Sequence, residues 1–149
     1  MWPHPQVVEL VTTAFVPVRV HVRDDAAEFR RLGQKYDAQW TPMILLLDFS
    51  GEERHRVEGF VPVPELLAQL EFGLGRIAFA RAGYDDAERH FRHVAQSGPD
   101  TEIAPEALYW AGVARYKSTD DGETLRETAS AIGDRYPRSI WAQKASVWR

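Results

Sequence analysis

The stretch that decides the fold reads YDAQWTP (36–42), MILLLDF (43–49), SG (50–51) and RHRVEGFV (54–61). The continuous apolar run 43–49 is typical of a strand that is buried on both faces of a sheet. Ser and Gly directly after it are turn residues. The run 54–61 then predicts a second strand, antiparallel to the first, so that the two form a hairpin.

The residues before this hairpin predict a helix, a strand and a second helix. WPHP (2–5) is a turn or helix entry because its prolines fix φ, and apolar residues at helical spacing follow over 7–15. VPVRVHV (16–22) alternates, which predicts a half-buried strand near a sheet edge. Asp24 and Asp25 are suited to cap a helix over 26–36, with Phe29, Leu32 and Tyr36 on one side.

The residues after the hairpin predict helices to the end of the chain, and they carry a faint repeat. Pro64 opens a helix that extends to about residue 82. A displacement of 38 residues places Pro99 on Pro137 and Trp110 on Trp148, and one of 37 places Gly75 on Gly112. A period of this length with small residues at helix contacts predicts stacked helical hairpins. We expect the aromatic residues of this half to fill its core, at Phe72, Phe79, Tyr84, Phe91, Tyr109, Trp110 and Tyr116.

Composition narrows the function classes. The 149 residues carry a net charge of −4, which gives no reason to expect nucleic acid or an anionic membrane as a partner. No apolar run reaches transmembrane length, and the start lacks the features of a secretory signal, so we expect a soluble, cytoplasmic protein. The chain has no cysteine, which excludes disulfides and thiolate chemistry within it.

Residues 2–72 resemble the C-terminal half of thioredoxin-fold proteins, and residues 2–22 look like the preceding helix and strand of the bacterial members. The Thr41-Pro42 dipeptide before a buried strand, with Gly59 near the end of the next strand, carries the resemblance. In that family the corresponding proline is cis, and the backbone of the residue before it pairs with an extended substrate chain. The resemblance therefore implies a peptide-binding site at Trp40, Thr41 and Pro42, in which Trp40 is an apolar wall, and a structural role for Gly59.

Residues 74–148 resemble tetratricopeptide-type helical hairpins. GYDDAE (83–88) is similar to the turn into the second helix of such a repeat, and ALYWAG (107–112) is similar to the first helix. Leu125 departs from the pattern, since the first copy has Ala87 there. The predicted fold is thus an α/β thioredoxin-like domain over 1–72, which lacks its first strand, followed by an all-α, tetratricopeptide-like domain over 73–149.

The missing strand has a physical consequence. In the thioredoxin fold the first strand lies between the strands that correspond to 16–22 and 43–49. Without it these neighbours pair directly, take up a strand from another chain, or leave backbone groups unpaired at a cost of roughly 1–3 kcal/mol for each buried group. A homodimer formed through the incomplete sheet is therefore a further expectation.

The function predicted first is non-catalytic: a protein-interaction or scaffold module whose partner is a protein or peptide, with no cofactor and no metal. His90 and His93 are three apart without a third ligand, which is typical of a solvated helix face. Trp141 and Trp148 suit a core or terminal cap better than a surface anchor. The alternative is a truncated or mis-started form of a thiol-disulfide oxidoreductase whose cysteine pair lies upstream of Met1.

Overall fold

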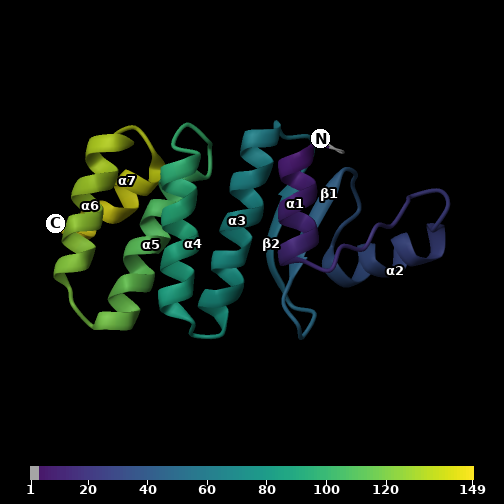
Figure 1. Ribbon diagram of the computed structural model, residues 1–149, viewed down its shortest axis with the longest axis horizontal. Helices are drawn as coiled ribbons and strands as arrows, with labels where there is room; N and C mark the ends of the chain where they lie inside the picture. The colour runs from purple at the N-terminus through teal and green to yellow at the C-terminus, as the bar shows by residue number, and fades with distance from the viewer. Residues whose placement is uncertain (1–3) are drawn as a thin grey trace. The chain divides into compact units, whose positions relative to one another are not determined.

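The computed structural model describes residues 4–149, so Trp2 and Pro3 of the predicted helix entry lie outside the described residues. The chain divides into two compact units, Met1–Leu67 and Ala68–Arg149 (Figure 1). The boundary lies within α3, as does the predicted boundary between residues 72 and 73. The elements are α1 (Pro5–Ala14), α2 (Ala26–Tyr36), β1 (Met43–Leu47), β2 (Glu53–Glu58), α3 (Val63–Ala80), α4 (Tyr84–Ser97), α5 (Ala104–Thr119), α6 (Glu123–Arg135), α7 (Ile140–Ala145) and the 3-10 turn Ser146–Trp148.

The predicted hairpin is confirmed. β1 and β2 pair antiparallel, with Met43 opposite Glu58 and Leu46 opposite His55, and a bulge follows Leu46. The connecting turn is held by the carboxylate of Asp48, which accepts hydrogen bonds from the backbone N–H groups of Ser50 and Glu52 at 2.9 and 3.1 Å. The same carboxylate accepts from Nε of Arg54 at 2.7 Å, so the turn is fixed by one side chain.

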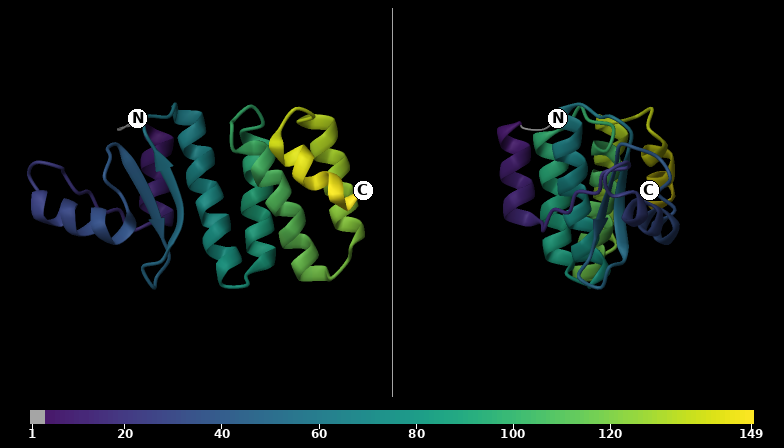
Figure 2. Two further views of the ribbon diagram at one scale, coloured as in Figure 1. Left: turned by 180° about the vertical axis from the view of Figure 1, so that it is seen from behind. Right: turned by 90° about the vertical axis from the view of Figure 1, so that its right-hand side faces the viewer.

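A small apolar core supports this hairpin. Leu46 and Val57 are buried on one face of the sheet, because Val57 lies opposite Ile44 and residues two apart on a strand share a face. Val7 and Val11 are the buried residues of α1, and α1 runs beside the sheet (Figure 2). A two-stranded sheet is marginal in water by itself, so helix packing of this kind is needed to stabilise it.

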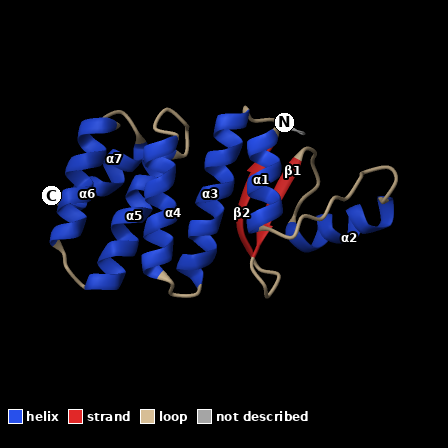
Figure 3. Ribbon diagram, viewed as in Figure 1, coloured by secondary structure: helices blue, strands red, loops and turns tan. Residues whose placement is uncertain are grey.

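The strand predicted over 16–22 is wrong. The segment has no regular secondary structure, and Val16 and Val18 are 92% and 82% exposed. Among residues 4–149 the sheet has two strands only (Figure 3). Alternation shows that a segment suits a sheet, but a strand also needs a neighbour that hydrogen-bonds its backbone, and residues 4–149 place no strand beside 16–22.

The helix predicted over 26–36 is confirmed as α2, but its apolar side is not buried. Gly33 is the one buried residue of α2, while Phe29, Leu32 and Tyr36 stay partly exposed. The C-terminal end of α2 is fixed to the hairpin by Arg56, whose Nη2 donates to the carbonyl of Tyr36 at 2.7 Å. A guanidinium at this position also balances the partial negative charge of a helix C-terminus.

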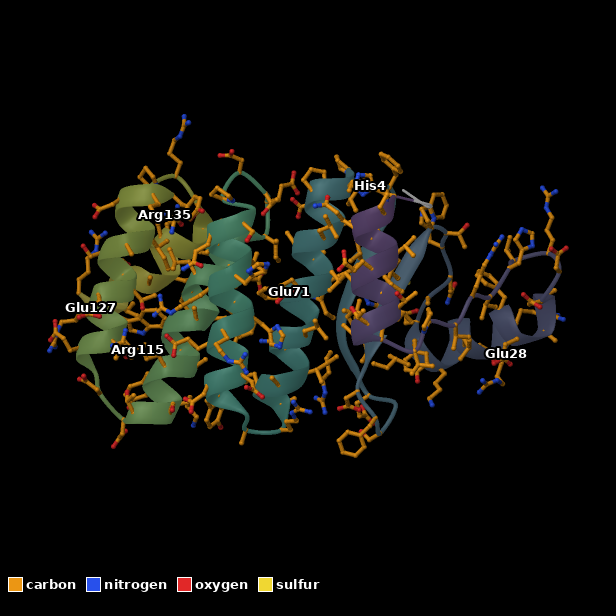
Figure 4. The ribbon with its side chains drawn as sticks, in the orientation of Figure 1. His4, Glu28, Glu71, Arg115, Glu127 and Arg135 are labelled. Atoms are coloured by element: carbon orange, nitrogen blue, oxygen red, sulfur yellow. The ribbon has the colours of Figure 1, made fainter. Side chains whose placement is uncertain are left out.

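The second unit is all-α and consists of successive antiparallel helices, α4 to α7, after the later part of α3 (Figure 1). Its core contains the predicted residues Phe72 and Phe91, whose rings lie 5.1 Å apart. Polar contacts join neighbouring helices as well: Arg115 of α5 and Glu127 of α6 approach to 4.0 Å (Figure 4), and Arg135 Nη2 donates to the carbonyl of Ala95 at 2.9 Å.

Two glycines allow the helices of this unit to approach closely. A Cβ on Gly75 would lie 2.5 Å from the ring of Phe91, and one on Gly112 would lie 2.5 Å from Cγ2 of Thr128. Both pairs are related by a displacement of 37 residues. At that displacement Ala87 corresponds to Thr124, and both are buried. The alignment of Ala87 with Leu125 was therefore wrong by one residue, because it placed the inserted residue in the α5–α6 loop, before this position, whereas the displacement of 37 still holds at Thr128.

No helix within residues 4–149 is long and apolar enough to cross a membrane.

Candidate peptide-binding site

The predicted site lies at the end of the hairpin opposite its turn. The Thr41–Pro42 peptide bond is cis, as the resemblance implied. The carbonyl of Pro42 accepts a hydrogen bond of 2.8 Å from the N–H of Gly59, so the residues just before β1 are tied to the residues just after β2. Gly59 has φ of +77°, a region that residues with a Cβ adopt only at a cost. Gly59 therefore lets the chain leave β2 at this bond.

Two exposed aromatic side chains flank this junction. Trp40 is 71% exposed on one side of it and Phe60 is 73% exposed on the other, and Thr41 and Pro42 between them are exposed as well. Aromatic rings of this kind cover large apolar areas when they are buried by a partner. Sequence reasoning missed Phe60, because it assigned this residue to a strand over 54–61, whereas β2 ends at Glu58. The position of Phe60 directly after Gly59 was the signal in the sequence that could have indicated its exposure.

The backbone next to Thr41 forms an open sheet edge. Residues of an antiparallel strand alternate between those that bond to the neighbouring strand and those that point away from it. Because Pro42 bonds to Gly59 and the Asp48 N–H donates to Glu52, Ile44 and Leu46 also face β2. Met43, Leu45 and Leu47 then direct their N–H and C=O groups to the other edge, along which residues 4–149 place no strand. An extended chain can add to such an edge.

The loop that carries Trp40 is held by an ion-paired arginine. Arg56 reaches back from β2 to the carbonyl of Tyr36, and its Nε and Nη2 donate to the carboxylate of Glu53 at 2.5 and 2.6 Å. The hydrogen bond that Arg56 donates to Glu53 is the main cause that raises the pKa of Arg56 above its ordinary value. The Tyr36 hydroxyl donates to the carbonyl of Gly51 at 2.8 Å, so the start of this loop is tied to both ends of the hairpin.

Asp48, in the hairpin turn, is the carboxylate whose pKa is shifted most. The hydrogen bond that the Ser50 hydroxyl donates to Asp48, followed by the bonds from Arg54 and from backbone N–H groups, holds the pKa of Asp48 well below its ordinary value. These partners all lie within the turn, and each of them stabilises the ionised carboxylate. Asp48 is therefore better explained as a structural residue of the hairpin than as an acid or base for catalysis.

The helical unit holds an aromatic row with two cations. Trp110 contacts Phe79 and Tyr109, and Tyr109 in turn packs on Trp148 and Trp141 at 4.5 and 5.0 Å between ring centroids. Both terminal tryptophans thus pack within the unit, as predicted. Arg76 lies over the Trp110 ring at 4.5 Å and Lys144 over the Trp141 ring at 3.9 Å.

A half-buried carboxyl group accompanies these aromatic residues. The Trp110 indole N–H donates to Glu106 at 3.3 Å. Burial nevertheless raises the pKa of Glu106, because desolvation outweighs this bond and the charges of Arg76 and Lys144. The row, with its cations and this carboxyl group, forms part of the packing of the unit.

The two histidines considered as metal ligands make different contacts. His90 Nδ1 lies 2.8 Å from the carboxylate of Glu71, across α3 and α4, while His93 contacts the hydroxyl of Ser97 on its own helix. Within residues 4–149 no group of three or more His, Cys, Asp or Glu side chains is placed to hold a metal ion.

Comparison with known proteins agrees with the fold of the first part of the chain. Residues 1–74 match the family model described as a thioredoxin-like domain. No curated protein and no solved structure matches the chain. The match supports a thioredoxin-like fold for these residues, which contain the cis-proline loop, the hairpin and both exposed aromatic side chains. It covers none of the helices from α4 onward.

Proposed function

We propose that this chain is a non-catalytic protein-interaction module that binds an extended segment of a protein or peptide at Trp40, Thr41 and Pro42. The observation that carries the proposal is that two aromatic side chains are exposed next to the cis-proline loop: Trp40 precedes Thr41 and Pro42 in the chain, and Phe60 follows Gly59, which bonds to Pro42. In this arrangement the edge supplies backbone hydrogen bonds, and the two rings supply the apolar area that adds affinity.

We propose a scaffold role for the helical unit, as a short array of tetratricopeptide-like hairpins. The close helix contacts at Gly75 and Gly112, displaced by 37 residues, support this assignment. About two repeats fit in this length, fewer than the three or more that such arrays need for stability. In our proposal the aromatic packing of Tyr109 against Trp141 and Trp148 compensates by closing the C-terminal end.

The proposed activity is binding without redox chemistry. Thiol-disulfide exchange requires a thiolate, and none of the 149 residues is a cysteine. A net charge of −4 favours a protein or peptide over nucleic acid or an anionic membrane as the partner. The proposal therefore assigns this chain the recognition part of a thioredoxin-like domain without its dithiol reaction.

A displayed library of random linear peptides, selected on the whole chain, tests the proposal. Selected peptides are expected to lose at least tenfold in affinity on the double variant Trp40→Ala/Phe60→Ala. The matched control is Val147→Ala, which removes an 80% exposed apolar side chain from the helical unit and is expected to leave the affinity unchanged. Peptides that bind the double variant as well as the parent chain, or a library that yields no binders, would contradict the proposal.

A further inference from the structure

The two edges of the sheet are opposite in character. β2 reads ERHRVE, so its edge is lined by charged residues, which is how natural proteins protect a sheet edge from pairing with another chain. β1 reads MILLL and has neither a charge nor a proline. Residues 4–149 place no strand beside it (Figure 3). An apolar, unprotected edge of this kind is a template for strand addition.

We infer that the β1 edge is an interface at which two copies of this chain pair, β1 against β1, in antiparallel orientation. The groups that point to this edge belong to Met43, Leu45 and Leu47, which are spaced evenly about Leu45. A two-fold axis at Leu45 sets this residue opposite the second copy's Leu45 and sets Met43 opposite the second copy's Leu47. Each of these three positions can then exchange both backbone hydrogen bonds with its partner.

The side chains suit this register as well as the backbone does. Because paired residues share a face, Met43, Leu45 and Leu47 would meet the same three apolar side chains of the second copy. The register also sets Thr41 of one copy opposite Phe49 of the other, and the reverse. Phe49 is 95% exposed in the turn after β1. A large side chain that its own chain leaves exposed would thus lie against the second copy.

The apolar area indicates a reversible dimer. An aromatic side chain buries roughly 150–250 Å², so Phe49 of two copies would contribute roughly 400 Å² at its observed exposure. This is about a third of the ~1,200 Å² at the lower end of stable interfaces. The paired backbones and the Met43, Leu45 and Leu47 side chains supply the remainder. We therefore expect association in the micromolar range.

This arrangement changes the place of β1 in the sheet. Within residues 4–149, β1 has one neighbouring strand. Pairing of two copies makes β1 an inner strand of a four-stranded antiparallel sheet whose outer edges are the two charged β2 strands. A peptide bound at Thr41 would run along the same edge. If the proposed function holds, peptide binding and self-association therefore compete.

The cysteine-free chain permits a direct test by single-cysteine crosslinking. Leu45→Cys is expected to form a disulfide-linked dimer under mild oxidation, because the Cα atoms of a hydrogen-bonded antiparallel pair lie about 5.5 Å apart, within disulfide range. Val16→Cys is the matched control, since Val16 is 92% exposed in the same unit but off the edge. We expect Leu45→Cys to crosslink at least ten times faster. A mixture of Met43→Cys and Leu47→Cys should give the mixed dimer in preference to either homodimer.

Sedimentation of the unmodified chain supplies the second readout. Its mass should rise from 17.0 kDa toward twice that value between 1 and 100 µM, on the order of the expected affinity. Leu45→Lys and Leu45→Glu should each stay monomeric, because like charges would face each other, and a mixture of the two should dimerise. Circular dichroism checks that each variant is folded.

Three results would overturn the inference: a monomer at 100 µM, equal crosslinking rates for Leu45→Cys and Val16→Cys, or a Met43→Cys homodimer that forms as fast as the mixed one. Failure of the peptide selection would leave each of these readouts unchanged, so the two proposals are tested separately.

Discussion

Replacing Gly112 by alanine tests the closest helix contact in the chain. A Cβ at this position would lie 2.5 Å from Cγ2 and 2.6 Å from Cβ of Thr128, distances that real Cβ atoms essentially never show. Thr128 is buried, and its hydroxyl already donates to the carbonyl of Thr124 at 2.7 Å, so its side chain has no free space to enter. Helices α5 and α6 must then move apart. Such overpacking costs about 1–3 kcal/mol.

The gain in helix propensity offsets part of this cost. Alanine is better than glycine inside a helix by about 1 kcal/mol. Because both the close approach and the burial of Thr128 favour the upper part of the overpacking range, we expect a net loss of about 1–2 kcal/mol in the free energy of unfolding. The melting temperature should fall by about 2–8 °C. Urea unfolding followed by circular dichroism at 222 nm measures the free energy directly.

Gly122→Ala is the matched control for this measurement. Gly122 precedes α6 with φ of −64° and ψ of −19°, and a Cβ there would meet nothing within 4 Å. We expect its free energy of unfolding to stay within about 0.5 kcal/mol of the parent value. Should Gly112→Ala prove as stable as this control, the α5–α6 contact at Gly112 would not be as close as described, and the argument for the 37-residue repeat would lose its best support.

Three further substitutions test the hairpin and the helical unit. Asp48→Asn should destabilise the chain at pH 6 and by a smaller amount at pH 3 in urea unfolding. The depressed pKa means that the stabilisation by Asp48 is complete above the ordinary carboxyl value near 4, begins to decline below it, and is lost as the pH falls through the folded-state pKa. Equal losses at both pH values would contradict this. Gly59→Ala should cost about 1–2 kcal/mol because φ is +77° with open space around it, and Gly59→Asn should cost less. Glu106→Gln should stabilise the chain at pH 7 and have no effect on its stability near pH 4. The reason is that a carboxyl group whose pKa is raised by burial contributes to stability only while it is protonated. Thermal unfolding at both pH values measures this difference.

Local patterns predicted the elements that depend on local physics. The apolar run 43–49 with its turn residues gave the hairpin, and the helical spacing gave the helix at 26–36, although the Asp25 carboxylate accepts from the N–H of His21 and does not cap the helix. The site was predicted in part: Trp40, Thr41 and Pro42 stand exposed at the end of the sheet, whereas Phe60 was not foreseen. Its exposure depends on where β2 ends, and β2 ends where its last backbone bond to the Pro42 loop is made. Sequence periodicity contains no information on that bond.

The error at 16–22 and the surprise at β1 have the same physical cause. Both segments have sequences that suit a covered sheet: the first alternates, and the second is apolar on both faces. Alternation and apolar content indicate the surroundings for which a sequence is suited, whereas a strand forms only when a backbone partner is present. Val16 and Val18 are exposed and irregular, and residues 4–149 place no strand beside them.

β1 retains its strand because β2 pairs with it on one side. The fully charged β2 edge shows that this chain can protect an edge, so the lack of protection on β1 is a property of that edge alone. The outward-facing and inward-facing positions of β1 should therefore respond differently when a second copy pairs with it. Pairing of a second copy should slow amide hydrogen exchange at Met43, Leu45 and Leu47, whose N–H groups point outward, and leave Ile44 and Leu46 unchanged, since these already bond to β2. Uniform protection along β1 on raising the concentration would mean that the strand is stabilised as a whole and not paired at its open edge.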